Sequence, residues 1–77
     1  MSDLAALNAG RAELGLSVHS LWIEYFALGG LRDLATLAAY LDGQNETSDR
    51  DHDLIALALN EAYHDRQMNH PVPYRLP

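Results

Sequence analysis

The sequence predicts an all-α fold, a compact domain of three to four helices with an extended, proline-containing C-terminal tail. The 77 residues include fourteen Leu and eleven Ala, which are strong helix formers, but only two Val and two Ile. No window alternates strictly between apolar and polar residues, as a half-buried strand would. We expect a single helical domain over residues 1–69. The tail, residues 70–77, holds three prolines, which exclude a helix there.

The first expected helix, residues 2–14, is weakly amphipathic, and Gly15 after it predicts a break. Glycine adopts the left-handed conformation that often follows a helix end, and Ser17 is a good N-cap for a new helix. A competing interpretation runs one continuous helix through this point. Its heptad seam would contain leucines spaced seven apart, namely Leu7, Leu14, Leu21 and Leu28. Interior glycines and Arg11 on the seam favour the break.

The second expected helix, residues 18–28, is the most apolar part of the chain. Its apolar side chains cover more than half of the circumference: Val18, Leu21, Trp22, Ile23, Tyr25, Phe26 and Leu28. Such a helix is either central in the fold or presents a second face to another protein. The pair Gly29–Gly30 is expected to end it.

Two further helices are expected, over residues 32–42 and 49–67. The third carries one apolar stripe, and the fourth again covers a broad apolar arc. Its polar side is expected to hold Asp53, Asn60, His64 and Gln67. Between them, the polar segment 42–53 is acidic, and Ser48 with Asp51 three residues later resembles a capping box. The tail is expected to be extended, and either docked through Val72 and Tyr74 or loose.

Charge and composition restrict the classes of partner and of site. The net charge is −6, and all five basic residues are Arg. Such a surface repels phosphates and anionic lipid headgroups, so we expect neither nucleic acid nor membrane as a partner. It favours a basic protein partner, although the charge also suits simple solubility. Cysteine is absent, which excludes disulfides and thiolate zinc sites. No secretory signal or long apolar run is present, so a cytoplasmic location is expected.

No complete catalytic or cofactor-binding motif is found, and the sequence predicts neither an enzyme nor a cofactor. Glu61 and His64 have the Glu-x-x-His spacing of di-iron bundles, but only one copy occurs. The spacing Asp49-x-Asp51-x-Asp53 is that of a calcium loop, whose required Gly and Glu are replaced by Leu and Asn. A helix-turn-helix over the last two helices would direct acidic residues at DNA.

The stretch GLSVHSLWIEYFALGG, with a following short helix, an acidic loop and a helix containing Asn60-Glu61, resembles a known group of sequences. These are small helical proteins of actinobacterial genomes. The resemblance covers about residues 13–74 and rests on Leu21-Trp22, Tyr25-Phe26 and Gly29-Gly30. It implies a helical fold and supplies no activity, cofactor or site.

The sequence therefore predicts a non-catalytic protein–protein interaction module of adaptor or regulatory type. Surplus apolar helix surface and an acidic patch would bind the partner. The residues expected to do so are Trp22, Tyr25, Phe26, Leu57, Asp49, Asp51 and Asp53. Tyr and Trp are enriched in binding hot spots, although Trp22 and Phe26 also suit a core. The alternative is an obligate homodimer of structural or scaffold character. A third interpretation is a helix-turn-helix DNA binder or a small metal protein.

Overall fold

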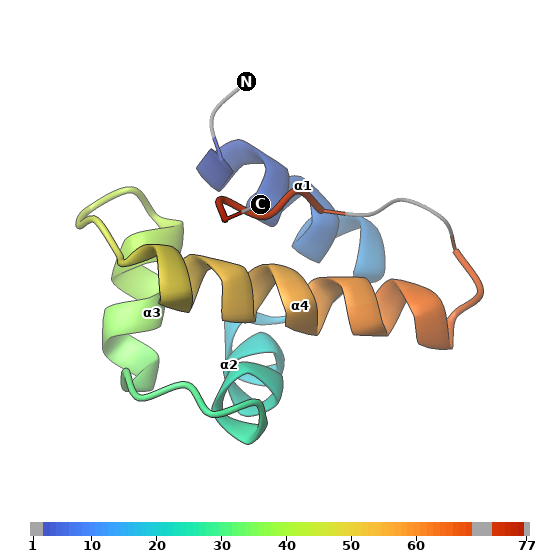
Figure 1. The fold of residues 1–77 in the computed structure, drawn as a ribbon, viewed down its shortest axis with the longest axis horizontal. Helices are drawn as coiled ribbons and strands as arrows, with labels where there is room; N and C mark the ends of the chain where they lie inside the picture. The colour runs from blue at the N-terminus through green and yellow to red at the C-terminus, as the bar shows by residue number, and fades with distance from the viewer. Residues whose placement is uncertain (1–2, 69–71, 77) are drawn as a thin grey trace.

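The computed structural model describes residues 3–68 and 72–76, and these form four helices with no strand. The helices are α1 (Asp3–Leu14), α2 (Val18–Ala27), α3 (Leu34–Leu41) and α4 (Asp49–Asp65). The predicted all-α fold is confirmed. Helix α4 is the longest and lies at the centre, with α1 on one side and α2 on the other (Figure 1). Helix α3 packs against α2 and α1.

Three of the helices begin at a side chain that caps them. The side chains of Ser17, Asp33 and Ser48 accept hydrogen bonds from backbone N–H groups at the start of α2, α3 and α4. Each bond satisfies a donor that the helix itself leaves without a partner. The predicted N-caps at Ser17 and Ser48 are thus confirmed.

The break at Gly15 is also confirmed, and the heptad interpretation is wrong. Gly15 has a φ of +68°, and its N–H and that of Leu16 bond back to carbonyls of the last turn of α1. This left-handed closure redirects the chain, so the seven-residue spacing of leucines does not lie along one helix. Gly29, with a φ of +100°, terminates α2 in the same way.

The core lies on both sides of α4 and is mostly aliphatic, with three tyrosines in it. Its fully buried side chains include Leu7, Leu21, Tyr25, Ile55 and Leu59. Because α4 is sandwiched between α1 and α2, its broad apolar arc is used within the domain. The fourth helix therefore leaves little apolar surface for a partner, contrary to the expectation that it would present some.

The described part of the tail is extended and docked. Val72 is buried against the helices, whereas Tyr74 remains about half exposed, so docking occurs through the first of the two expected residues. Asn60 of α4 donates to the Val72 carbonyl and accepts from the Val72 N–H. Asp53 accepts from the N–H groups of Arg75 and Leu76. The boundary expected at residues 69–70 lies outside the described residues.

Candidate interaction surface

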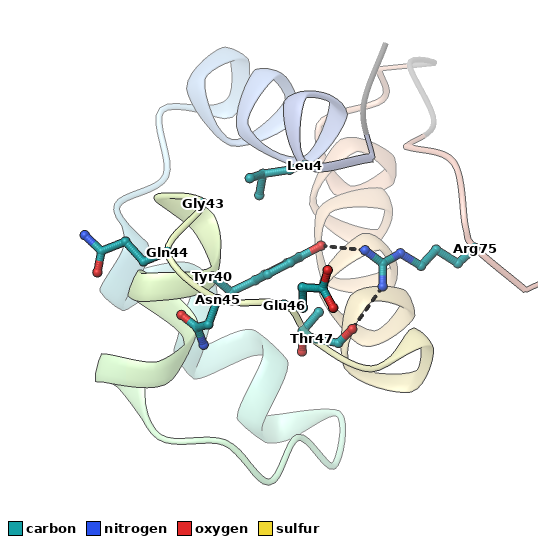
Figure 2. Close-up of a pocket in the computed structure, with 8 residues that line it drawn as sticks. All are labelled: Leu4, Tyr40, Gly43, Gln44, Asn45, Glu46, Thr47 and Arg75. Carbon is teal, nitrogen blue, oxygen red and sulfur yellow. Dashed lines mark hydrogen bonds between the residues drawn. The ribbon is translucent and has the colours of Figure 1, made fainter.

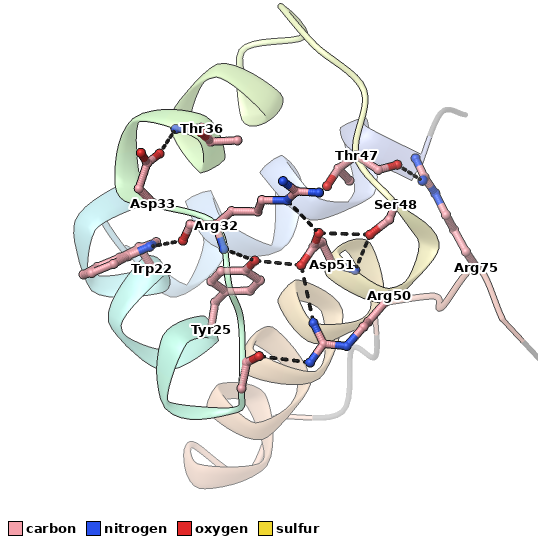
Figure 3. Close-up of polar contacts among 11 residues, drawn as sticks. Trp22, Tyr25, Arg32, Asp33, Thr36, Thr47, Ser48, Arg50, Asp51 and Arg75 are labelled. Atoms are coloured by element: carbon pink, nitrogen blue, oxygen red, sulfur yellow. Dashed lines mark hydrogen bonds and ion pairs between the residues drawn. The ribbon is translucent and has the colours of Figure 1, made fainter.

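Tyr25, expected to bind a partner, is a core residue. Its side chain is fully buried, and its hydroxyl donates to Asp51 Oδ1 at 2.7 Å (Figure 3). The same hydroxyl accepts the N–H of Arg32 at 3.1 Å. Gly30 makes room for the ring, because a Cβ there would lie 2.3 Å from it. The interpretation of Tyr25 as an interface residue is wrong, because its apolar ring and its hydroxyl are both satisfied inside the domain.

Asp51 is likewise an internal residue, only 5% exposed. Besides the Tyr25 bond, its carboxylate accepts from the Ser48 hydroxyl at 2.9 Å and lies 3.4 Å from Arg32 Nε. Burial acts to raise the pKa of this carboxyl, but the hydrogen bonds from Tyr25, Ser48 and Arg32 outweigh burial and lower it. The placement of Asp51 in a partner-binding patch is therefore wrong. Its charge ties α2, the following loop and α4 together.

The other two predicted acidic residues also have partners within the domain. Asp49 is exposed, with its Oδ1 3.5 Å from Arg75 Nη1. Asp53 is partly buried and accepts two N–H groups of the tail. Asp49, Asp51 and Asp53 therefore do not form one outward acidic patch. This arrangement argues against an acidic docking site at residues 49–53.

The outer face of α2 carries exposed apolar side chains. Phe26 is 60% exposed and Ile23 is 47% exposed, while Trp22 is partly buried. The Trp22 and Phe26 rings lie 5.4 Å apart, and the His19 ring lies 6.3 Å from Trp22. The Trp22 indole N–H donates to the Arg32 carbonyl at 3.0 Å, which fixes the ring (Figure 3). We call His19, Trp22, Ile23 and Phe26 the α2 stripe.

The α2 stripe has helical spacing and lies on the outer side of α2, with Trp22 at its edge packed against the core. Its members stand at positions i, i+3, i+4 and i+7, which places them side by side along a helix. The buried residues of α2 are Leu21 and Tyr25, on the other side. Leu31, in the loop after α2, is 84% exposed, directly before the Arg32 that holds Trp22. Sequence reasoning selected Trp22 and Phe26 and missed His19, Ile23 and Leu31.

Leu57 lies elsewhere, on α4. It is partly buried and lines an open depression of about 370 Å³ with Asn60, Glu61, His64 and Asp65. The depression that Leu57 lines includes no residue of the α2 stripe. Among the residues that the structure describes, no three His, Asp or Glu side chains gather so that they could hold a metal ion.

Comparisons with protein-family models, with curated proteins and with solved structures find no match. Within the described ranges, no helix has both the length and the apolar character needed to cross a bilayer. The arrangement that stands out chemically is the α2 stripe, because large apolar side chains are exposed beside a fixed Trp22 ring at the surface of a small acidic domain.

Proposed function

We propose that this chain is a non-catalytic adaptor or regulatory module that binds another protein through the α2 stripe. The observation that carries the proposal is the exposure of Ile23 and Phe26 beside a Trp22 ring fixed by its bond to the Arg32 carbonyl. Trp22 is already held in place by this bond, so its ring loses little conformational freedom when it binds. Aromatic anchors of this kind dominate binding energy in protein interfaces.

The α2 stripe fits into an apolar groove on a partner protein. The α2 stripe has the i, i+3, i+4 and i+7 pattern with which an amphipathic helix enters a groove. A stable flat interface buries about 800 Å² on each side, more than four side chains of one ten-residue helix supply. A groove encloses a helix and so gains more contact from the same side chains. The net charge of −6 favours a groove with a basic rim, which would speed association.

A matched pair of variants tests the proposal on the full chain. Phe26→Glu places a charge in the α2 stripe, and Ala27→Glu places the same charge at the next exposed residue, outside the stripe. Partners captured by the wild type would be purified and their affinities measured. Loss of a hot-spot residue costs about 2 kcal/mol or more, so Phe26→Glu should weaken binding at least about 30-fold and Ala27→Glu much less.

Sedimentation of the purified chain at micromolar concentrations distinguishes a second copy from another protein as the occupant. A dimer that Phe26→Glu dissociates, and Ala27→Glu does not, would identify the second copy and support the homodimer alternative. Equal partner binding by the wild type and Phe26→Glu would refute the assignment of the surface to the α2 stripe.

A further inference from the structure

Residues 72–76, which we call the strap, contact α1 and α4 and lie on the α1 side of α4, whereas α2 lies on the other side (Figure 1). The strap is first held in place at Val72, which is only 4% exposed. Its Cγ2 lies only 3.1 Å from where a Cβ on Gly10 would stand, so a larger residue at position 10 would press on it. Asn60 bonds both the N–H and the C=O of Val72. This end of the strap is held by shape and by backbone hydrogen bonds.

The strap is also held in place by Arg75, whose guanidinium contacts four separate groups. Its Nε donates to Asp3 Oδ2 at 3.0 Å, and its Nη1 donates to the Thr47 carbonyl at 3.1 Å. Asp49 lies 3.5 Å from Nη1. The Nη2 of Arg75 donates to the Tyr40 hydroxyl at 3.3 Å (Figure 2). These acceptors come from α1, α3, α4 and the loop before α4, so Arg75 joins four parts of the fold.

An almost fully buried histidine lies next to the strap. His52 is 1% exposed, and its Nδ1 lies 3.0 Å from the Tyr40 hydroxyl. The backbone of Pro73 also acts on the ring as a hydrogen-bond partner, which raises the pKa of His52. Proline has no N–H, so the Pro73 carbonyl must accept this bond, and His52 must donate it through Nε2.

These contacts define one protonation state. With the proton on Nε2, the Nδ1 of neutral His52 accepts from the Tyr40 hydroxyl, and that hydroxyl accepts from Arg75. The hydrogen bonds thus run from Arg75 through Tyr40 and His52 to Pro73. Both ends of this series lie on the strap. We propose that the strap is a proton-sensitive closure: neutral His52 holds it against the helices, and protonation of His52 releases it.

The reason is that an imidazolium ion keeps its bond to the Pro73 carbonyl but can no longer accept from the Tyr40 hydroxyl. It carries N–H groups on both ring nitrogens, so Nδ1 would donate to the Tyr40 oxygen that Arg75 already uses. The Tyr40 hydroxyl proton would then lose its acceptor inside the protein, which is costly. A second cation would also lie close to Arg75. Release of the strap hydrates His52 and removes Arg75, which relieves both conflicts.

The charged groups around His52 do not offset this effect. Asp3 of α1 and Asp49 of α4 face Arg75, and Asp53 of α4 accepts two N–H groups of the strap. Burial lowers the pKa of His52, and the charge of Arg75 lowers it further. The hydrogen bond to the Pro73 backbone and the charges of Asp3 and Asp53 raise the pKa, but by less. The neutral form is therefore favoured while the strap is closed.

Hydrogen exchange on the full chain tests the proposal. The N–H groups of Val72, Arg75 and Leu76 are bonded only while the strap is closed. Their protection, corrected for the intrinsic effect of pH on exchange, should fall between pH 7.5 and pH 5. The fall should be about tenfold for each unit that separates the pKa of His52 in the closed and open states. An NMR titration of the His52 ring in the same sample should share its midpoint.

Two variants complete the test. His52→Asn keeps an acceptor near the position of Nδ1 but cannot be protonated, so the protection of the three amides should no longer depend on pH in this range. The control, His64→Gln, removes an exposed histidine of the same helix and should behave as the wild type. Protection that stays constant in the wild type, or that falls equally in His52→Asn, would overturn the proposal. If His52→Asn does not fold, separate midpoints for ring and amides in the wild type would overturn it as well.

Discussion

Removal of one buried hydroxyl, by Tyr25→Phe, is expected to destabilise this domain strongly. The change leaves the ring and its packing against Gly30 in place. It removes the donor to Asp51 Oδ1 and the acceptor for the Arg32 N–H. The variant therefore isolates the polar contacts of Tyr25 from its apolar contacts, and it tests the finding that Tyr25 belongs to the core.

The magnitude follows from the two lost bonds. A hydrogen bond to a charged group contributes about 1.5–3 kcal/mol, and a buried donor without a partner costs about 1–3 kcal/mol. The Arg32 N–H is only part-buried, so the lower end applies to it. We expect a loss of about 2–4 kcal/mol in the free energy of unfolding. A chain of 77 residues has about 4–12 kcal/mol in total, so the loss is a large fraction of it.

Urea denaturation followed by far-UV circular dichroism at pH 7 measures the effect, and the melting temperature should fall by roughly 10–25 °C. Tyr63→Phe is the matched control, because Tyr63 is also buried but its hydroxyl donates to Glu13, an exposed residue. It should cost about 1 kcal/mol. A Tyr25→Phe variant no less stable than Tyr63→Phe would refute the reasoning.

Three further perturbations have defined outcomes. Gly15→Ala, at a φ of +68°, should lower the free energy of unfolding by about 1–2 kcal/mol, and a raised melting temperature would contradict the break. Gly30→Ala should lower the free energy of unfolding, measured by urea denaturation, by about 3 kcal/mol, because the new methyl group clashes with the buried Tyr25 ring. Because the pKa of His52 is lowered in the folded state, the free energy of unfolding is highest above the ordinary value of 6.5 and falls as the pH drops below it. Because the pKa of Asp51 is also lowered, the free energy of unfolding falls again below pH 3.8. Urea midpoints from pH 7.5 to pH 3 should show both losses, and His52→Asn should abolish the upper one alone.

Local signals in the sequence were enough to predict the helices and the break between the first two. The third helix is shorter than the expected 32–42, because Asp33 caps it and it spans Leu34–Leu41. Gly15 and Ser17 each act through backbone groups of nearby residues, so their roles follow from sequence position. The composition, rich in Leu and Ala, decided the fold class. Helix α4 ends at Asp65 instead of residue 67, and Gln67 takes a φ of +57°.

The orientation of α2 could not be predicted in the same way. An apolar arc wider than half a helix does not show which part faces inward, and Tyr25 was placed outward with Trp22 and Phe26. Its burial depends on Asp51, 26 residues later in the chain. The sequence did contain one indication of a second apolar face, namely the spacing i, i+3, i+4 and i+7 within the arc. This spacing includes His19 and Ile23, which were not predicted to lie on the interaction surface.

The roles of the acidic residues, and the choice between a docked and a loose tail, could not be predicted for a related reason. Asp53 and Asn60 were expected on the polar side of the fourth helix, and they are polar contacts for the tail. An extended segment of five residues has no periodicity from which docking could be inferred. Only the fold brings Val72 beside Gly10, 62 positions earlier in the sequence.

Site-specific photo-crosslinking tests the proposed interaction surface most directly. A benzophenone amino acid at position 26 lies in the α2 stripe, and the same group at position 24 lies on another exposed face of α2. Irradiation in cells of the organism that encodes the chain should yield one discrete protein adduct from position 26 and none from position 24. Adding Ile23→Glu should abolish that adduct. Equal adducts from both positions, or an adduct that persists with Ile23→Glu, would contradict binding through the α2 stripe.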